Sequence, residues 1–480
     1  MKKPNILFLM CDQLQKTAID KESQCMTPNF DYLASLGTKF ERAYTPNAVC
    51  SPARASLMTG LLPHNHGMVY VHHNVDRDQS VLRLDKKHWA MRLAENGYHN
   101  AYFGKWHVEN TECPADFGWH LDCSSKSALY REKAANRLFK GLDENYSLAR
   151  FYQTPGYKNS IFYGVTDRPP ENRAFGITTS MALEYLDEAV KQEEPWCCFV
   201  SVEEPHDPFI CGEEAYALYD AQNLELPPNV WDDAQDKPGI YRKAARVWKE
   251  FSEREKKKAM ACYYASITEI DAQFGRLIGK VEESGCRDNT IIILTTDHGE
   301  LLGAHGIYCK NFGAFEEVYN VPLIVAGPGI GKGRQTSARV GIHDLCPTIL
   351  DLTQSEPIPV PESSSFADLL KGCADEKEFQ TGYAEYFGGR MILTQRIVWD
   401  GKWKFVFNGF DFDELYDLEK DPYEMINLID APSHRDVVKR LTKAMWAKIK
   451  QTGDRTLLNS HYPILRVAPF GPDMKQETDG

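Results

Sequence analysis

A cysteine stands directly before a predicted helix in the segment AVCSPARASLMTG, residues 48–60. Ser51 and Pro52 suit the N-cap and the first helical position, and Gly60 suits the helix stop. Cys50 would then lie at the helix mouth, where free N–H groups and the dipole favour an anion. Arg54, one turn later, adds a positive charge. The segment predicts a thiol beside an anion-binding site, with a small buried cysteine at an ordinary helix start as the alternative.

Polar side chains follow two apolar runs that we expect to form strands. Asp12 and Gln13 come after NILFLM, and Asp297 and His298 come after TIIILTT. Because the ends of parallel strands converge on one edge of a sheet, these four side chains should meet there. Two carboxylates, an amide oxygen and an imidazole would together make a divalent cation site. Each Asp taken alone is more typical of a turn or a helix cap.

Four further polar residues fall in short motifs. YFGKWHVE places Lys105 and His107 two apart at the end of an expected strand, so that both side chains can point the same way. EEPHDPF supplies His206 in a proline-flanked loop, and HGIYCKNFGAFEE supplies Lys310. Each is weak evidence alone, because a single lysine is usually a solvated surface charge and a single histidine is often a satisfied polar residue.

The elements that must position these residues predict an α/β fold with a large, mostly parallel sheet flanked by helices. NILFLM, CCFVSV, TIIILTT and VPLIVAG, the last starting at Val321, are continuous apolar runs that suit strands buried on both faces. Helices are expected from Pro28 to the stop at Gly37 and over about 250–283. The stretch from about 110 to 173 is irregular and aromatic-rich, which suits an insertion over a sheet edge.

The pattern changes in the last quarter of the chain. MILTQRIVWDGKWKFVFN alternates as an antiparallel hairpin that turns at Asp400-Gly401, and a helix is expected over about 434–451. We therefore predict a large domain at 1–375 that carries the candidate site. A smaller C-terminal α+β domain with an antiparallel sheet and a helix should occupy 376–480.

Composition excludes several classes of partner. The chain has 480 residues, a formal net charge of -13 and a pI near 5.6, whereas nucleic acid or an anionic membrane requires clustered positive charge. Thirteen cysteines scattered without CxxC pairs argue against a disulfide framework or a zinc module and favour the cytoplasm. The run from Ile6 to Met10 is too short for a signal peptide, and no stretch approaches the ~18 apolar residues of a membrane span. The sequence leaves open whether the protein forms a homo-oligomer.

The string Cys-Ser-Pro-Ala-Arg-Ala-Ser-Leu-Met-Thr-Gly fills every position of the sulfatase signature, and the chain resembles the type I, cysteine-type sulfatases of the alkaline-phosphatase-like superfamily from end to end. The resemblance implies that a formylglycine-generating enzyme or a radical maturase converts Cys50 to formylglycine. It also implies one divalent cation and a small-molecule sulfate ester as substrate. The implied metal ligands are Asp12, Gln13, Asp297, His298 and the modified Cys50.

The resemblance further implies a mechanism. The hydrated formylglycine at position 50, a gem-diol, attacks sulfur while His206 or Lys310 protonates the departing alcohol. His107 then deprotonates the second hydroxyl, which expels inorganic sulfate. Arg54 and Lys105 hold the diol and the sulfate oxygens.

The sequence departs from the commonest family pattern at Gln13, where an Asp usually stands. One negative charge fewer should weaken a Ca²⁺ site, and His298 leaves room for Mn²⁺, although Ca²⁺ remains the expected ion. Choline sulfatases and phosphonate monoester hydrolases share this form, which keeps a phosphonate monoester or phosphodiester hydrolase open as the alternative function. A non-catalytic binding protein of this fold is a third reading.

The expected substrate is a small O-sulfate monoester, either a sulfated mono- or disaccharide or an aryl sulfate. The segment HNHGMVYVHHNVDRD, with His64, His66, His72 and His73, would line a pocket or form a solvated loop. Arg390, in EYFGGRMILTQR, is a candidate contact for an acidic sugar.

Overall fold

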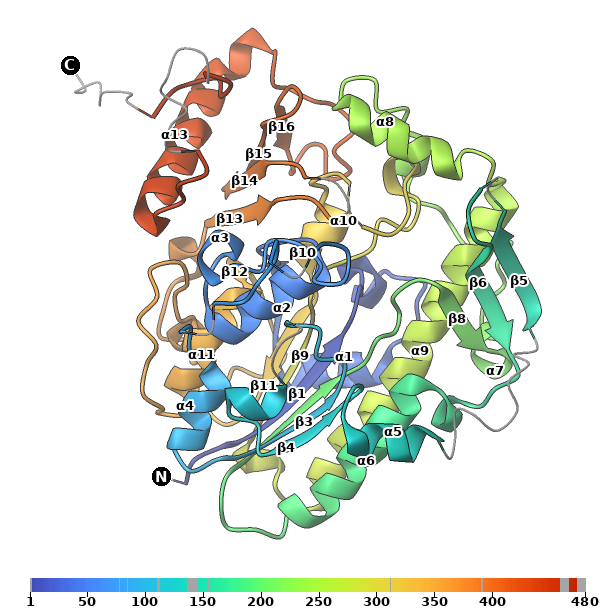
Figure 1. Ribbon diagram of the computed structural model, residues 1–480, viewed down its shortest axis with the longest axis vertical. Helices are drawn as coiled ribbons and strands as arrows, with labels where there is room; N and C mark the ends of the chain where they lie inside the picture. Colours follow the sequence, from blue (N-terminus) through green and yellow to red (C-terminus); the bar gives the residue numbers. More distant parts are fainter. Residues whose placement is uncertain are drawn as a thin grey trace.

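A nine-stranded sheet forms the centre of the molecule (Figure 1). The structure is a computed structural model that describes residues 2–76, 78–83, 85–109, 113–135, 146–153, 156–310, 312–389, 392–457 and 466–472. The strands of this sheet are β1 (Asn5–Cys11), β2 (Gly37–Tyr44), β3 (His99–Gly104), β4 (Leu121–Ser124), β7 (Trp196–Ser201), β9 (Thr290–Thr296), β10 (Asn320–Val321), β11 (Leu323–Ala326) and β12 (Arg334–Gly341). Their order is β10-β2-β11-β9-β1-β7-β3-β4, and β12 pairs with β2.

The predicted mostly parallel sheet is confirmed, with one correction. Five of its pairings are parallel and three are antiparallel. The strands β1, β7 and β9 are buried along their whole length, as their continuous apolar runs predict. The run that begins at Val321 contributes β11, which is antiparallel to both of its neighbours. An apolar run indicates that a strand is buried on both faces, but it does not indicate the direction of the strand. The antiparallel direction of β11 could therefore not be predicted from its run.

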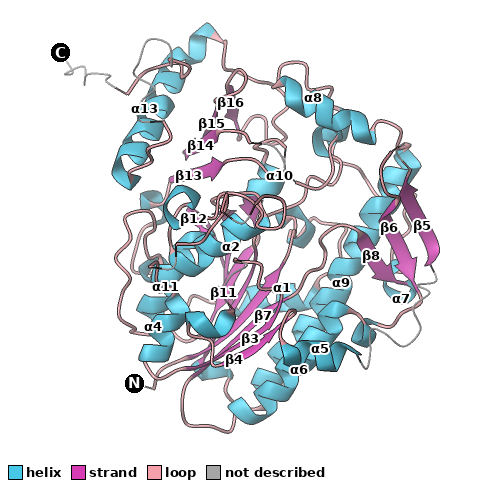
Figure 2. Ribbon diagram, in the orientation of Figure 1, coloured by secondary structure: helices cyan, strands magenta, loops and turns pink. Residues whose placement is uncertain are grey.

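Helices cover both faces of the sheet (Figure 2). One face packs against α1 (Pro28–Leu36), α6 (Ala174–Ala189) and α9 (Glu253–Glu283). The other packs against α2 (Cys50–Thr59), α4 (Trp89–Glu95), α11 (Leu345–Leu352) and α12 (Ala367–Leu370). Successive β1 residues face opposite layers, since Leu7 and Leu9 join the first core and Phe8 joins the second. The result is a three-layer α/β/α arrangement.

The two long predicted helices have clear start signals. Helix α9 has Ser252 as its N-cap, whose hydroxyl accepts from Glu255 N–H at 3.3 Å while the Glu255 carboxylate accepts from Ser252 N–H at 2.9 Å. Helix α1 begins with Pro28 at its first position and is followed by Gly37. Both helices agree with the sequence-based prediction within three residues at either end.

A four-stranded antiparallel sheet lies in the C-terminal part of the chain. It comprises β13 (Thr381–Tyr386), β14 (Gln395–Asp400), β15 (Trp403–Asn408) and β16 (Glu414–Asp417), and α13 (Arg435–Thr452) packs against it. The predicted hairpin joins β14 to β15 through Gly401, whose φ of 57° suits glycine. The domain boundary at 375 remains a prediction.

The stretch expected to be irregular contains regular structure. Its strands β5 (Tyr146–Tyr152) and β6 (Ser160–Thr166) form a three-stranded sheet with β8 (Phe209–Gly212). The expectation was wrong because β6 pairs with β8, a partner distant in sequence that no local pattern reveals. The remaining α-helices are α3 (Pro63–His66), α5 (Ala128–Ala135), α7 (Glu213–Tyr216), α8 (Gly239–Ala245) and α10 (Glu316–Tyr319).

Two further observations concern cysteines and membranes. All thirteen cysteines are free thiols. Within the described parts of the chain, the helices are too short or too polar to cross a bilayer.

Candidate active site

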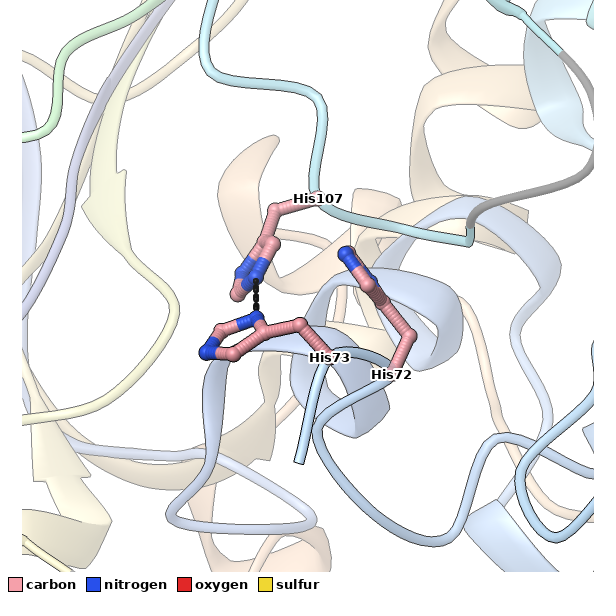
Figure 3. A group of neighbouring side chains, drawn as sticks. All are labelled: His72, His73 and His107. Atoms are coloured by element: carbon pink, nitrogen blue, oxygen red, sulfur yellow. Dashed lines mark hydrogen bonds between the residues drawn. The ribbon is translucent and has the colours of Figure 1, made fainter. Parts of the chain in front are cut away.

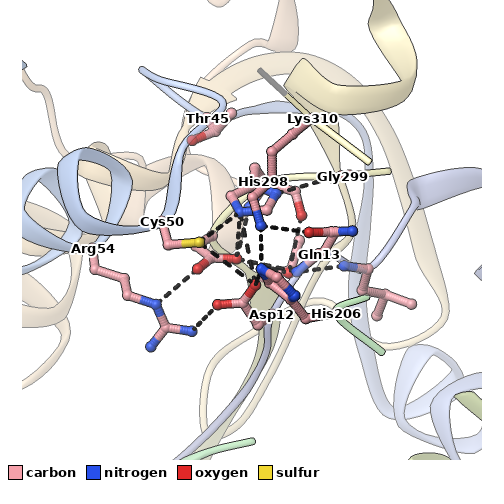
Figure 4. A network of polar contacts seen from close by, with 12 residues as sticks. Asp12, Gln13, Thr45, Cys50, Arg54, His206, His298, Gly299 and Lys310 are labelled. Carbon is pink, nitrogen blue, oxygen red and sulfur yellow. Dashed lines mark hydrogen bonds and ion pairs between the residues drawn. The ribbon is translucent and has the colours of Figure 1, made fainter. Parts of the chain in front are cut away.

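The ends of two adjacent parallel strands place the acidic residues side by side, as predicted. Strands β1 and β9 are in register so that Cys11 lies opposite Thr296, the last residue of each strand. Asp12 and Asp297 therefore leave the sheet at the same edge, and each is fully buried. Figure 4 shows Asp12 together with Cys50, Arg54 and His298.

Helix α2 brings Cys50 to that edge. The Cys50 Sγ lies 3.2 Å from His298 Nε2 and 3.8 Å from Asp12 Oδ1. The helix begins at Cys50 with Val49 as N-cap, so the predicted N-cap at Ser51 is wrong. The cause is the hydrogen bond from Ala53 N–H to Val49 C=O at 3.0 Å, which closes the first turn earlier. Cys50 is the first helical residue and still lies at the helix mouth.

Arg54 joins the two carboxylates. Its Nε donates to Asp297 Oδ2 at 2.7 Å, and a terminal nitrogen donates to Asp12 Oδ2 at 3.1 Å. The other terminal nitrogen donates to Ser201 Oγ at 2.8 Å and to the Lys105 carbonyl at 3.0 Å. Arg54 therefore occupies the Oδ2 atom of each carboxylate. The two Oδ1 atoms lie on the side of Cys50 and His298, each 3.7 Å from His298 Nε2.

Four side chains at this edge match the donor set of a divalent cation. The ligand atoms of Asp12, Cys50, Asp297 and His298 all lie within 4.8 Å of one another. Two carboxylate oxygens and an imidazole nitrogen are ligands that suit a divalent cation such as Ca²⁺ or Mn²⁺. Two fully buried carboxylates also favour a nearby cation. The residues present therefore fit such an ion.

Gln13 lies against this group through a network that sequence reasoning missed. Its backbone N–H donates to Asp297 Oδ1 at 3.2 Å, and its side-chain oxygen accepts from Lys310 Nζ. The side-chain nitrogen donates to Asp207 Oδ1 at 3.1 Å and to the Glu300 carboxylate. Asp207 and Glu300 are the missed residues, and their sequence signal is that Asp207 directly follows His206 and Glu300 lies two residues after His298.

Cationic groups dominate the electrostatics around the thiol. Lys105 Nζ lies 2.8 Å from Asp12 Oδ2, and Lys310 Nζ contacts His206 Nε2. Burial opposes ionisation of Asp12, but Lys105, His206 and Lys310 outweigh it and hold the Asp12 pKa well below its ordinary value. Burial and Asp12 likewise raise the pKa of Cys50, yet the lysines bring the net shift well below the ordinary value. The position of Cys50 therefore favours negative charge.

The two candidate proton carriers have opposite pKa shifts. Burial and Lys310 lower the pKa of His206, but Asp12 and Asp207 outweigh them and raise it above its ordinary value. Burial lowers the pKa of His107 to about 4, although Cys50 acts in the opposite direction. His107 is therefore neutral near pH 7, whereas His206 retains its proton more readily than an ordinary imidazole.

The histidines downstream of the signature divide into two groups. His66 is buried against Ser56 Oγ at 2.9 Å, and His64 Nδ1 lies 2.7 Å from Glu385 Oε1. Those two side chains are structural. His72 and His73 instead lie beside His107 (Figure 3). Arg390, the candidate sugar contact, lies outside the described residues.

Comparison with known proteins agrees with this geometry. Residues 4–355 match the sulfatase family, and residues 303–451 match the family N-sulphoglucosamine sulphohydrolase, C-terminal. The chain is 30% identical to the uncharacterized sulfatase YidJ of Escherichia coli, over 93% of this chain and 87% of that protein. It is 29% identical to a choline-sulfatase of Rhizobium meliloti, over 90% and 83%.

A solved structure shares the fold. The phosphonate monoester hydrolase SpPMH from Silicibacter pomeroyi superimposes with a TM-score of 0.80 at 23% identity, covering 95% of this chain and 97% of that one. The fold is therefore the alkaline-phosphatase-like fold, and the family match over most of the sequence settles the assignment. The chain belongs to the sulfatase family.

Proposed function

We propose that this protein hydrolyses a small O-sulfate monoester to an alcohol and inorganic sulfate, with a formylglycine made from Cys50 as the nucleophile. The observation that carries the proposal is the position of Cys50. It is the first residue of α2, touches His298 and faces Asp12. The surrounding lysines favour negative charge there, which is the charge of a sulfate ester.

The chain's own residues supply binding and proton transfer. When present, the bound cation would neutralise negative charge and activate the formylglycine hydroxyl, with Asp12, Asp297, His298 and Gln13 as its ligands. Arg54 and Lys105 each form an ion pair with Asp12, which fixes the position of both side chains. From these positions they hold the reacting group. These anchors fix the positive charges before substrate arrives, so little reorganisation is needed during reaction.

Proton transfer follows from the two shifted histidines. His206 Nε2 contacts Lys310 Nζ, so a protonated group stands ready for the departing alcohol oxygen. His107 is neutral near pH 7 because burial holds its pKa at about 4, and its imidazole accepts the proton whose removal releases sulfate. We assign His206 or Lys310 as the acid and His107 as the base.

Ca²⁺ is the proposed ion, with Mn²⁺ as the alternative. Asp12 and Asp297 provide hard oxygen ligands, whereas His298 provides a borderline nitrogen that Mn²⁺ accepts more readily than Ca²⁺ does. The proposal also requires a maturase, either a formylglycine-generating enzyme or a radical enzyme, that acts on Cys50. An unmodified thiol cannot form the two hydroxyls of the hydrated aldehyde.

The test uses protein whose conversion at position 50 has been confirmed by mass spectrometry. We expect nitrophenyl sulfate to be turned over by the wild type and by Cys373→Ala, a matched change at an exposed cysteine. Cys50→Ala should be inactive, and wild-type activity in that variant would refute the nucleophile assignment. A screen of sulfated sugars, choline sulfate and aryl sulfates then identifies the substrate class.

A phosphonate monoester hydrolase is the second candidate, favoured by the pair Gln13 and His298 in place of the commoner ligand types. Comparing kcat/KM on matched nitrophenyl sulfate and nitrophenyl phosphonate esters decides between the two. We expect the sulfate to be the better substrate. A higher value for the phosphonate would assign the second function.

A further inference from the structure

Three imidazoles form a compact cluster beside the candidate active site (Figure 3). His73 Nδ1 lies 3.1 Å from His107 Nε2, and the rings of His72 and His107 are 4.4 Å apart. One ring nitrogen from each of the three residues lies within 4.8 Å of the corresponding nitrogens of the others. His72 and His73 occupy a turn after α3, and His107 follows β3, so two separate segments build the cluster.

The spacing suits a tetrahedral metal ion. Zn²⁺ binds imidazole nitrogens at about 2.0–2.1 Å, so two nitrogens on one tetrahedral ion are roughly 3.3 Å apart. The contact of 3.1 Å between His73 and His107 is already close to that separation. Three histidines with an open fourth position are a well-known donor set for zinc, whereas Ca²⁺ requires oxygen ligands.

The cluster also has a preset orientation. His72 is buried, and its Nδ1 contacts Ser51 Oγ at 3.2 Å. That contact leaves Nε2 as the nitrogen that would bind a metal, in the way that a second hydrogen-bond partner usually orients a metal-binding histidine. Burial and the neighbouring His107 lower the pKa of His72 to about 3, so its imidazole is neutral, as ligation requires.

We propose that His72, His73 and His107 form a Zn²⁺ site separate from the cation site at Asp12 and Asp297. The site shares His107 with the reaction. A zinc ion there occupies the imidazole lone pair that would otherwise accept a proton, so zinc inhibits turnover reversibly. The binding of zinc is independent of the proposed function, and only the inhibition rests on it.

Zinc binding is measured by isothermal titration calorimetry with ZnCl₂ on the full chain in saturating Ca²⁺, which fills the oxygen-rich site. The wild type should bind one zinc ion that His73→Ala fails to bind. His434→Ala, a histidine change before α13 and outside the cluster, should keep it. A thermal melt of each variant checks that it is folded. In a second titration Co²⁺ replaces zinc, and intense visible absorption then indicates tetrahedral coordination.

The outcomes separate the two proposals. Loss of the calorimetric and Co²⁺ signals in folded His73→Ala, with retention in His434→Ala, supports the site. Equal zinc binding by wild type and His73→Ala, or absence of zinc binding by the wild type, overturns it. Zinc should inhibit sulfate ester hydrolysis by the wild type, and the inhibition constant should rise at least tenfold in His73→Ala. Unchanged inhibition in that variant overturns the regulatory role, whereas absence of hydrolysis without zinc counts against the proposed function alone.

Discussion

Replacing Arg54 with methionine tests whether this guanidinium holds the acidic pair together. Arg54, Asp12 and Asp297 are at most 1% exposed, and Arg54 contacts both carboxylates. Removing one partner of a buried ion pair costs about 3–5 kcal/mol, because the remaining charge is left uncompensated. We therefore expect Arg54→Met to lower the free energy of unfolding by about 3–5 kcal/mol when divalent cations are chelated.

Added Ca²⁺ should recover part of that loss, since a cation beside the same carboxylates replaces some of the missing positive charge. A ligand at a hundred times its Kd stabilises the folded state by about 2.7 kcal/mol. The recovery in Arg54→Met should exceed the stabilisation of the wild type, because the variant site is more negative and binds the cation more tightly.

The assay is urea unfolding followed by circular dichroism, in EDTA and in saturating Ca²⁺. Ser201→Ala is the matched control, since it removes one hydrogen bond of Arg54 and leaves both ion pairs. That control should cost about 1–3 kcal/mol. If Arg54→Met in EDTA lost no more stability than Ser201→Ala, the guanidinium would not be compensating the carboxylates and our reasoning would be wrong.

Two further predictions concern His64 and His298. Burial lowers the pKa of His64, but Glu385 outweighs burial and the net pKa is raised. The ion pair of His64 with Glu385 therefore stabilises the fold fully below about pH 6.5. This contribution is lost as pH rises through the pKa of the folded state. His64→Gln should therefore be less stable than the wild type at about pH 6, by about 1.4 kcal/mol for each tenfold difference in proton affinity between the folded and unfolded states. The gap in urea midpoints should shrink at higher pH, and a gap that does not depend on pH would contradict this. His298→Asn replaces a nitrogen ligand with an oxygen, so the affinity for Ca²⁺ should rise relative to that for Mn²⁺. Competitive titration of the two ions measures this ratio. An unchanged ratio would exclude His298 as a ligand.

The candidate site could be predicted from sequence because its members are marked locally. Asp12 and Asp297 each follow an apolar run directly, and parallel strands bring such ends together. Cys50 and Arg54 share one helix and a full signature. The apolar runs predict the two strands and the signature predicts the helix, whereas the pairing of β1 with β9 comes from the structure.

Contacts between distant segments could not be predicted. Glu300 accepts from Gln13 across the sheet edge, and nothing in either motif specifies that pairing. The sheet formed by β5, β6 and β8 depends on partners from separate parts of the chain, and β5 is only half-buried, so its apolar pattern is weak. The grouping of His73 with His107 likewise depends on where two loops fold.

Hydrogen bonding, rather than net charge, should separate a sulfate ester from a phosphonate ester in the proposed site. A sulfate monoester and a phosphonate monoester each carry one negative charge, so Lys105 and Lys310 attract them alike. The sulfate has three terminal oxygens, whereas the phosphonate has two and a carbon. Lys105 and Lys310 are the ammonium groups that act on Cys50, and both carry N–H donors. A carbon in place of a sulfate oxygen would leave one such donor without a partner, at a cost of about 1–3 kcal/mol. Since about 1.4 kcal/mol is a factor of ten in rate, we expect these donors to favour the sulfate by roughly 5- to 150-fold.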